Sequence, residues 1–139
     1  MDKMPIPQGK YVPATRCEGI VFTAGMTPRR SGVLILSGKV SDMHPINFYK
    51  EAVEQAAENA LVAARNTLDN DEEIRQILTM TVFVNSESNF TEQSKIADLA
   101  SSYLFERLDA RGIGARVAVG VASLPSNAPV EIQLTVAVG

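Results

Sequence analysis

Two mostly apolar segments near the carboxyl end of the chain each carry one charged residue. Arg116 lies in the segment 115–123, whose other residues are Ala, Val, Gly and Ser, and Glu131 lies in the segment 130–138. An arginine guanidinium can bind a carboxylate through two parallel charge-assisted hydrogen bonds. Apolar surroundings raise the pKa of a glutamate, which suits a general acid or base near neutral pH. The pair therefore indicates carboxylate binding combined with acid–base chemistry.

The same two charges could instead form a structural ion pair or lie at a hydrated rim. Other residues have two interpretations as well. Tyr11 could place a phenol over a pocket or simply anchor the chain, and Gly25 could offer its backbone N–H to an anion or satisfy an unusual backbone conformation at a strand end. Arg29 and Arg30 could attract anions, but a solvated turn is the favoured interpretation of that pair.

The chain contains one histidine, His44, and one cysteine, Cys17. A Ser-His-Asp triad would have to use His44, which precedes Pro45 at an expected helix start, and a Cys/His zinc site would have only these two ligands. We therefore expect no metal site and interpret both residues as structural. A single cysteine also excludes an intrachain disulfide.

The chain has 139 residues, of which 45% are hydrophobic and 21% charged, and this suits one domain over 1–139 with a loosely held arm at 1–10. The net charge of −3 and the scattered basic residues argue against a nucleic-acid partner. The start of the chain has no apolar core typical of a signal peptide, and no run approaches the ~20 apolar residues of a membrane helix. We expect a cytoplasmic protein without a membrane partner.

Hydrophobic patterns predict an α+β fold with the element order ββαβαββ. Strands are expected at 19–26, 33–40, 79–85, 115–123 and 130–138, with the first two forming a hairpin around a turn at 27–32, and helices at 45–68 and 89–112. Each helix has one apolar stripe, and the stripe of the first is mostly alanine. The economical architecture is a single mixed sheet with both helices on one face.

Alternation along the last two strands predicts which residues share a face. In 130–138 the aliphatic residues point one way, and Glu131 points the other way with Gln133 and Thr135. If the valines of 115–123 also face the helices, Arg116 joins Glu131 on a small, semi-polar second face. Such a face is typical of a subunit contact, and we therefore predict a homo-oligomer.

The segments "YVPATRCEGIVFTAGMTPR", "TVFVNSESNF" and "ARVAVGVASLPSNAPVEIQLTVAV" resemble the Rid family, also called the YjgF-type or reactive intermediate deaminase family. The resemblance runs from about Tyr11 to Val138. It implies a chorismate-mutase-like fold and a homotrimer in which the sheets form a central barrel, with ligand clefts between subunits. It also implies water-dependent deamination of enamines and imines to 2-keto acids and ammonia, without a metal or an organic cofactor.

The resemblance also implies roles for individual residues. The motif arginine falls on Arg116, which would hold the substrate carboxylate, and the acid after the Leu-Pro turn falls on Glu131, which would position a water or move its proton. The N-terminal tyrosine falls on Tyr11, which would close over the ligand. The strand-end glycine falls on Gly25, with a backbone group facing the carboxylate.

Three positions depart from the family pattern. Met26 stands where glutamine is usual, Val117 replaces the Ser or Thr after the arginine, and Gly114 replaces a proline. The pocket should therefore be more apolar than in the known deaminases, which favours a bulkier imino acid than 2-aminoacrylate. Two other functions stay open: a non-catalytic protein that binds small carboxylates, and an endoribonuclease.

Overall fold

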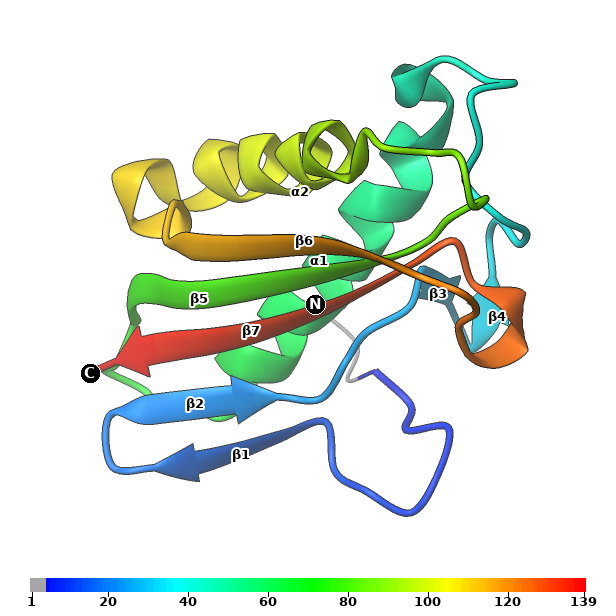
Figure 1. The fold of residues 1–139 in the computed structure, drawn as a ribbon. Coiled ribbons are helices and arrows are strands. Elements are labelled where there is room, and N and C mark those ends of the chain that lie inside the picture. Colours follow the sequence, from blue (N-terminus) through cyan, green and yellow to red (C-terminus); the bar gives the residue numbers. More distant parts are fainter. Residues whose placement is uncertain (1–4) are drawn as a thin grey trace.

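The computed structural model describes residues 5–139, in which a five-stranded mixed sheet packs against two long helices (Figure 1). The strands lie in the order β1-β2-β7-β5-β6, with β5 and β6 parallel and the other neighbours antiparallel. This confirms the predicted fold class and element order. The elements are β1 (Ala14–Cys17), β2 (Ile20–Thr23), α1 (Lys50–Arg65), β5 (Ile74–Asn85), α2 (Gln93–Leu108), β6 (Ala115–Val121) and β7 (Val130–Val138).

The first hairpin begins earlier in the chain than predicted. It joins β1 to β2 through the two-residue turn Glu18-Gly19, in which Glu18 has a φ of 54°. The predicted return strand at 33–40 is instead the short β4 (Val33–Leu34), which pairs with β3 (Arg29–Arg30) in a separate ribbon. The sequence "ATRC" of β1 lacks the apolar alternation typical of a strand, so β1 is not predictable from its residues alone.

Both helices are shorter than predicted because 3-10 turns take up part of their expected ranges. One such turn, Ile46–Tyr49, precedes α1, and Pro45 before it has extended backbone angles. A second, Asp109–Gly112, follows α2, which ends where Asp109 adopts a φ of 54°. A third, Pro125–Asn127, lies in the turn between β6 and β7.

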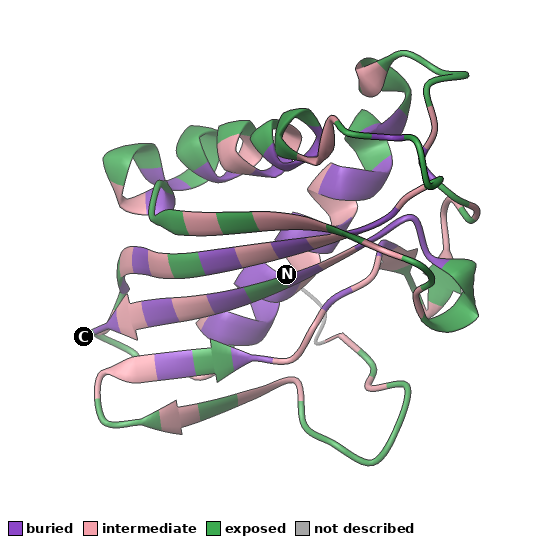
Figure 2. Cartoon of the chain, in the orientation of Figure 1, coloured by how far each residue is buried: buried purple, intermediate pink, exposed green. Residues whose placement is uncertain are grey.

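The core lies between the helices and one face of the sheet (Figure 2). The predicted alanine stripe of α1 is buried, and its small side chains let the helix approach the sheet closely. The aliphatic side chains of β7 form the opposing wall, as alternation predicted. The buried residues of these two elements include Val53, Ala56, Ala60, Ala63, Ala64, Val130, Ile132, Leu134, Val136 and Val138.

A bidentate ion pair ties the edge hairpin to the turn after α1. Arg16 on β1 donates from Nη1 and Nη2 to the two carboxylate oxygens of Glu72, each at 2.6 Å. The Arg16 guanidinium and the backbone N–H of Asp69 hold the pKa of Glu72 at about 2. Because the folded state lowers this pKa, the pair stabilises the protein above the pKa of an unfolded glutamate, and the contribution is lost as the pH falls toward 2.

Glu72→Gln is therefore expected to lower the melting temperature at pH 7, because the neutral amide loses the charge-assisted fork with Arg16. The difference from the wild type should shrink as the pH falls toward 2, where Glu72 itself becomes protonated. Thermal unfolding followed by circular dichroism across this range measures both effects. Asp71→Asn, an exposed change in the same turn, is the matched control. An equal loss at every pH would contradict the ion-pair explanation.

Candidate functional site

Glu131 lies on the uncovered face of the sheet, against Gly25. Alternation along β7 buries Ile132 under the helices and turns Glu131 to the other side. Met26 and Ile132 exchange two backbone hydrogen bonds of 2.7 and 2.8 Å, and these bring the end of the β2 segment against β7. A Cβ added to Gly25 would lie 2.1 Å from Glu131 Oε2. The missing side chain of Gly25 thus makes room for the carboxylate.

Among residues 5–139, the Glu131 carboxylate has no hydrogen-bonding or charged partner. It is half-buried, and within the described part of the chain no side-chain hydrogen bond or ion pair involves it. Burial raises its pKa above the ordinary value of a glutamate. An unpaired, partly desolvated carboxylate can accept a proton from water or from a ligand at moderately acid to neutral pH.

Gly25→Ala is expected to displace the Glu131 carboxylate, because the new Cβ would overlap Oε2. The atoms in its way belong to a side chain that can rotate, so the fold should survive with a small change in melting temperature. Any activity that depends on Glu131 should fall at least tenfold, the range in which loss of a positioned acid–base group is felt. Steady-state rates and thermal unfolding of the variant test this. Gly25 has no positive φ, so the alanine adds no backbone strain and its effect reports the displacement of Glu131.

Arg116 does not share a face with Glu131, and the sequence prediction is wrong on this point. Arg116 pairs with the buried Met80 of β5, whereas Glu131 pairs with Phe83, three residues further along. Residues three apart on a strand point to opposite faces. Arg116 therefore lies on the helix side, where its terminal nitrogens bond to Ser94 Oγ and O (2.8 and 3.2 Å), Asp98 Oδ1 (2.8 Å) and Ser101 Oγ (3.0 Å) of α2.

The close approach of α2 explains why the faces of β6 are reversed. A Cβ on Gly120 would lie 2.8 Å from Gln93 Nε2, so a larger residue at this position would displace the Gln93 side chain of α2. The valines, including Val117 with 53% of its surface exposed, occupy the uncovered side. The small residues of this edge strand and the hydrogen-bonded Arg116 thus face the helix, and the valines face away from it.

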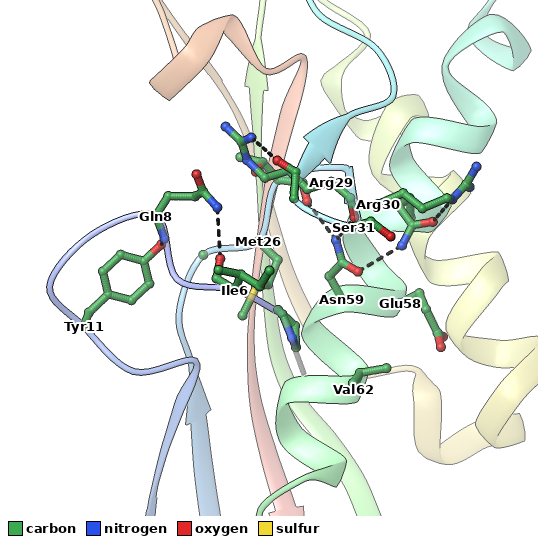
Figure 3. Close-up of a pocket in the computed structure, with 15 residues that line it drawn as sticks. Ile6, Gln8, Tyr11, Met26, Arg29, Arg30, Ser31, Glu58, Asn59 and Val62 are labelled. Carbon is green, nitrogen blue, oxygen red and sulfur yellow. Dashed lines mark hydrogen bonds between the residues drawn. The ribbon is translucent and has the colours of Figure 1, made fainter. Parts of the chain in front are cut away.

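Three of the predicted site residues come together at one cavity of about 330 Å³ (Figure 3). Tyr11, Gly25 and Met26 line it, together with residues of β3 and α1. The Tyr11 hydroxyl accepts a hydrogen bond of 3.0 Å from the backbone N–H of Gln8, and the ring is half-exposed. Met26 is 93% buried, so its thioether forms part of an apolar wall. Arg116, Val117 and Glu131 are not among the residues that line this cavity, although Glu131 lies directly beside Gly25.

The sequence matches the family model described as Endoribonuclease L-PSP over residues 1–138. The chain belongs to this family. The match confirms the resemblance to YjgF-type and Rid proteins. Among solved structures, the L-PSP chain resembles Atu1372 of Agrobacterium tumefaciens, a protein of unknown function (34% identity, TM-score 0.83), over 94% of this chain and 82% of the other.

Two further proteins resemble the L-PSP chain. E. coli TdcF, solved with bound serine, shares the fold at 24% identity with a TM-score of 0.67, over 96% of this chain and 91% of the other. Protein TCP17 of Trypanosoma cruzi is 29% identical over 86% of this chain and 76% of its own length.

The sequence did not predict that β3 and α1 line the cavity of this L-PSP protein. Arg29 and Arg30 form β3 on the cavity wall rather than a solvated turn, and Asn59 and Gln55 of α1 face them. The two adjacent arginines stand out in the sequence as a possible anion-attracting pair, but only the fold shows that α1 lies opposite them. Within residues 5–139, no cluster of His, Cys, Asp or Glu could hold a metal, and no helix is long and apolar enough to cross a membrane.

Proposed function

We propose that the protein hydrolyses 2-imino acids and their enamine tautomers to 2-keto acids and ammonia. The observation that carries the proposal is the half-buried, unpartnered carboxylate of Glu131 beside the backbone of Gly25. Imines already hydrolyse in water, so orientation and one acid–base group are enough for a useful acceleration. The resemblance to the Rid family implies this reaction class, whereas the description of the matching family model names an endoribonuclease.

In the proposed reaction, Glu131 takes a proton from a water molecule as its oxygen bonds to the imine carbon. Glu131 then returns this proton to the nitrogen, so the C=N double bond becomes a C–N single bond to an amino group. The C–N bond breaks as the hydroxyl proton passes to the nitrogen, the bonding electron pair leaves with ammonia, and the C=O of the 2-keto acid forms. A polar backbone group of Gly25 would face the substrate carboxylate, and the Tyr11 side chain would close over the ligand.

We place the site between the subunits of a homotrimer in the cytoplasm. Arg116 and Glu131 lie on opposite faces of one sheet, so a substrate that touches both must take them from two chains. The uncovered face carries the exposed side chains of Phe22 and Val117, with 47% and 53% of their surfaces accessible, and this supports its burial by other subunits. Met26 and Val117 would then favour substrates with apolar side chains.

Asp98→Asn is expected to strengthen carboxylate binding. The α2 residues bond all four terminal N–H groups of Arg116, so a substrate carboxylate has to displace one of them. Asp98 is the charged competitor, and its side chain is 65% exposed. Removing an exposed ion pair is worth up to about 1 kcal/mol, so the Kd for a 2-keto acid should fall about threefold to fivefold. Calorimetric titration tests this, with Glu106→Gln on the same helix as control; weaker binding by Asp98→Asn would contradict it.

The decisive experiment couples the protein to an amino-acid oxidase that generates imines in place. Wild-type protein should accelerate keto-acid release, most for apolar amino acids, and Arg116→Ala should not. If no amino acid gives acceleration but 2-keto acids still raise the melting temperature, the protein is a binding protein and the deaminase proposal fails. Incubation with RNA belongs to the same experiment, because the family description names an endoribonuclease.

Charge pairing argues for a small molecule rather than RNA. Five basic side chains in the described region form ion pairs with carboxylates, so they offer little free positive charge to a phosphate backbone. RNA cleavage by the purified protein that disappears in Glu131→Gln would overturn this preference.

A further inference from the structure

Thr23 is a buried polar residue to which the proposed hydrolysis assigns no role. Only 2% of its surface is exposed, and among residues 5–139 Asn85 is the one other polar residue that is buried. A hydroxyl that is removed from water costs free energy unless it forms hydrogen bonds, so its place in a core needs a reason. Thr23 ends β2, two residues before Gly25. This position suggests a role in guiding the chain into the site.

The pairing of the β2 segment with β7 contains one extra residue just before the site. Phe22 pairs with Thr135, but the next pair along the chain is Met26 with Ile132. The two pairs enclose residues 23–25 on the β2 side and one residue fewer on β7. An extra residue on one strand of an antiparallel pair is a β-bulge, and bulges commonly re-aim side chains next to active sites.

The hydroxyl of Thr23 forms hydrogen bonds at the point where the bulge interrupts the ladder. Hydrogen-bonded pairs alternate along an antiparallel ladder, and the bond from Val138 N to the Gly19 carbonyl marks one such pair. Counted in steps of two from that pair, Leu134 N would donate to the Thr23 carbonyl in a regular ladder. Here Leu134 N donates to Thr23 Oγ1 at 3.0 Å, and Thr23 Oγ1 donates to the Ala24 carbonyl at 2.9 Å.

The buried N–H of Leu134 depends on this hydroxyl. Leu134 has no accessible surface, so water cannot take the place of Thr23 Oγ1. A buried donor without a partner is costly, and the hydroxyl therefore stabilises the bulged pairing. The Thr23 carbonyl in turn accepts a hydrogen bond of 3.2 Å from Gln133 Nε2. Side chains from both strands thus form hydrogen bonds across the bulge.

The bulge decides which residue lies beside Glu131. Directly opposite residues of a strand pair share a face, so Met26 lies on the helix side with the buried Ile132. Gly25 is thereby turned to the uncovered side, against Glu131. If the register of β2 continued without the bulge, Gly25 would pair with Ile132. The side chain of Met26 would then lie beside Glu131, because a shift of one residue moves every side chain to the other face.

Gly25 also has backbone groups available to a ligand. The N–H groups on either side of it are bonded: Ala24 N donates to the Pro13 carbonyl at 2.8 Å, and Met26 N donates to the Ile132 carbonyl at 2.7 Å. In the part of the chain that the structure describes, no group forms a hydrogen bond with the N–H or the carbonyl of Gly25. The bulge therefore combines a free backbone N–H with room for the neighbouring carboxylate.

We propose that Thr23 is a positioning residue for imine hydrolysis: its hydroxyl stabilises the bulge that places Gly25, rather than Met26, beside Glu131. Its effect on the rate rests on the proposed function, whereas the bulge and its hydrogen bonds are present without a substrate. Thr23 acts through the two groups that it places. Loss of its hydroxyl should therefore disturb both carboxylate binding at Gly25 and proton transfer at Glu131.

Thr23→Val keeps the shape of the side chain and removes the hydroxyl. It should lower kcat/KM for imino acids at least tenfold in the oxidase-coupled assay, because a displacement of about 1 Å in a site can cost about 100-fold. Both kcat and KM should change. Thr23→Ser, which keeps the hydroxyl, should retain most of the wild-type rate.

Val136→Ala, which truncates a buried side chain of β7 away from the bulge, is the control for lost stability. It should lower the melting temperature with little effect on kcat/KM. A loss of activity in Val136→Ala equal to that in Thr23→Val would assign the effect to stability and overturn the proposal. Thr23→Ser with a rate as low as that of Thr23→Val would overturn it as well.

Hydrogen exchange tests the bulge without turnover. The Ile132 amide donates to the Met26 carbonyl at 2.8 Å, directly after the bulge. In Thr23→Val this amide should exchange at least about tenfold faster relative to the Val136 amide of the same strand, since an unpaired buried donor opens the pairing locally. An unchanged ratio would overturn the role of Thr23 whatever the activity. If the ratio changes but the wild type hydrolyses no imine, the proposed function fails and Thr23 still holds the bulge.

Discussion

Glu131→Gln is expected to slow the hydrolysis of 2-imino acids by about 100-fold or more, because a positioned general base contributes 10²–10⁴ to such rates. Glutamine keeps the shape of the side chain beside Gly25 but cannot take a proton from water. The oxidase-coupled assay with wild type and variant measures the loss. A fall in kcat with little change in KM is expected, because the carboxylate acts on water rather than on the substrate carboxylate.

The pH profile gives a second test of the same residue. If ionised Glu131 is the base, the wild-type rate should rise with pH through a midpoint above the ordinary pKa of about 4.3, because burial raises the pKa of this carboxyl. Glu131→Gln should lose that limb of the profile. A limb that survives in the variant would assign the titration to another group.

Stability should change in the opposite direction to activity. Because folding raises the pKa of Glu131, its contribution to stability is greatest below the pKa of an unfolded glutamate and is lost as the pH rises through the folded value. Glutamine is neutral throughout, so the variant should melt above the wild type at pH 8, and the difference should shrink at pH 4. A variant that is less stable at both pH values would indicate a structural role for Glu131.

The sequence contained enough information for the fold because most elements have clear periodicity. The alanine stripe of α1 and the strict alternation of β7 each predict one buried face, and both are observed. The edge elements carry weaker signals. β1 and β3 are stabilised by pairing with the next strands, β2 and β4, and the sequences "ATRC" and "RR" contain nothing that marks a strand by itself.

The candidate site was predictable only in part, because its geometry depends on which side of β6 faces α2. Polarity suggests that the valines face the helices and Arg116 faces away. The structure reverses this, because Gly120 leaves just enough space for Gln93 and the Arg116 guanidinium finds acceptors on α2. A single sequence shows neither how closely α2 approaches β6 nor that serines of α2 accept hydrogen bonds from Arg116.

Arg116→Ala should lower kcat/KM for imino acids about 100-fold, because the substrate carboxylate loses charge-assisted hydrogen bonds worth about 1.5–3 kcal/mol each. The loss should appear mainly in KM, in contrast to Glu131→Gln. Arg116 also bonds to α2, so Ser101→Ala, which removes one of those bonds without changing charge, is the control for local disruption. A similar loss in Ser101→Ala would assign the effect to the packing of α2.

Mixed oligomers decide whether Arg116 and Glu131 act from two subunits, as we propose from their positions on opposite sheet faces. When Arg116→Ala and Glu131→Gln chains are co-refolded in equal amounts, about a quarter of between-subunit sites regain both residues, because each site draws one residue from each of two chains. A site within one chain would regain none. An equal mixture of wild-type chains and chains that carry both substitutions is the reference. It should have about a quarter of full activity if each site is shared by two chains, and about half if each site lies within one chain. Activity near a quarter in both mixtures would establish that the uncovered sheet face works only when a neighbouring subunit brings its own Arg116 to it.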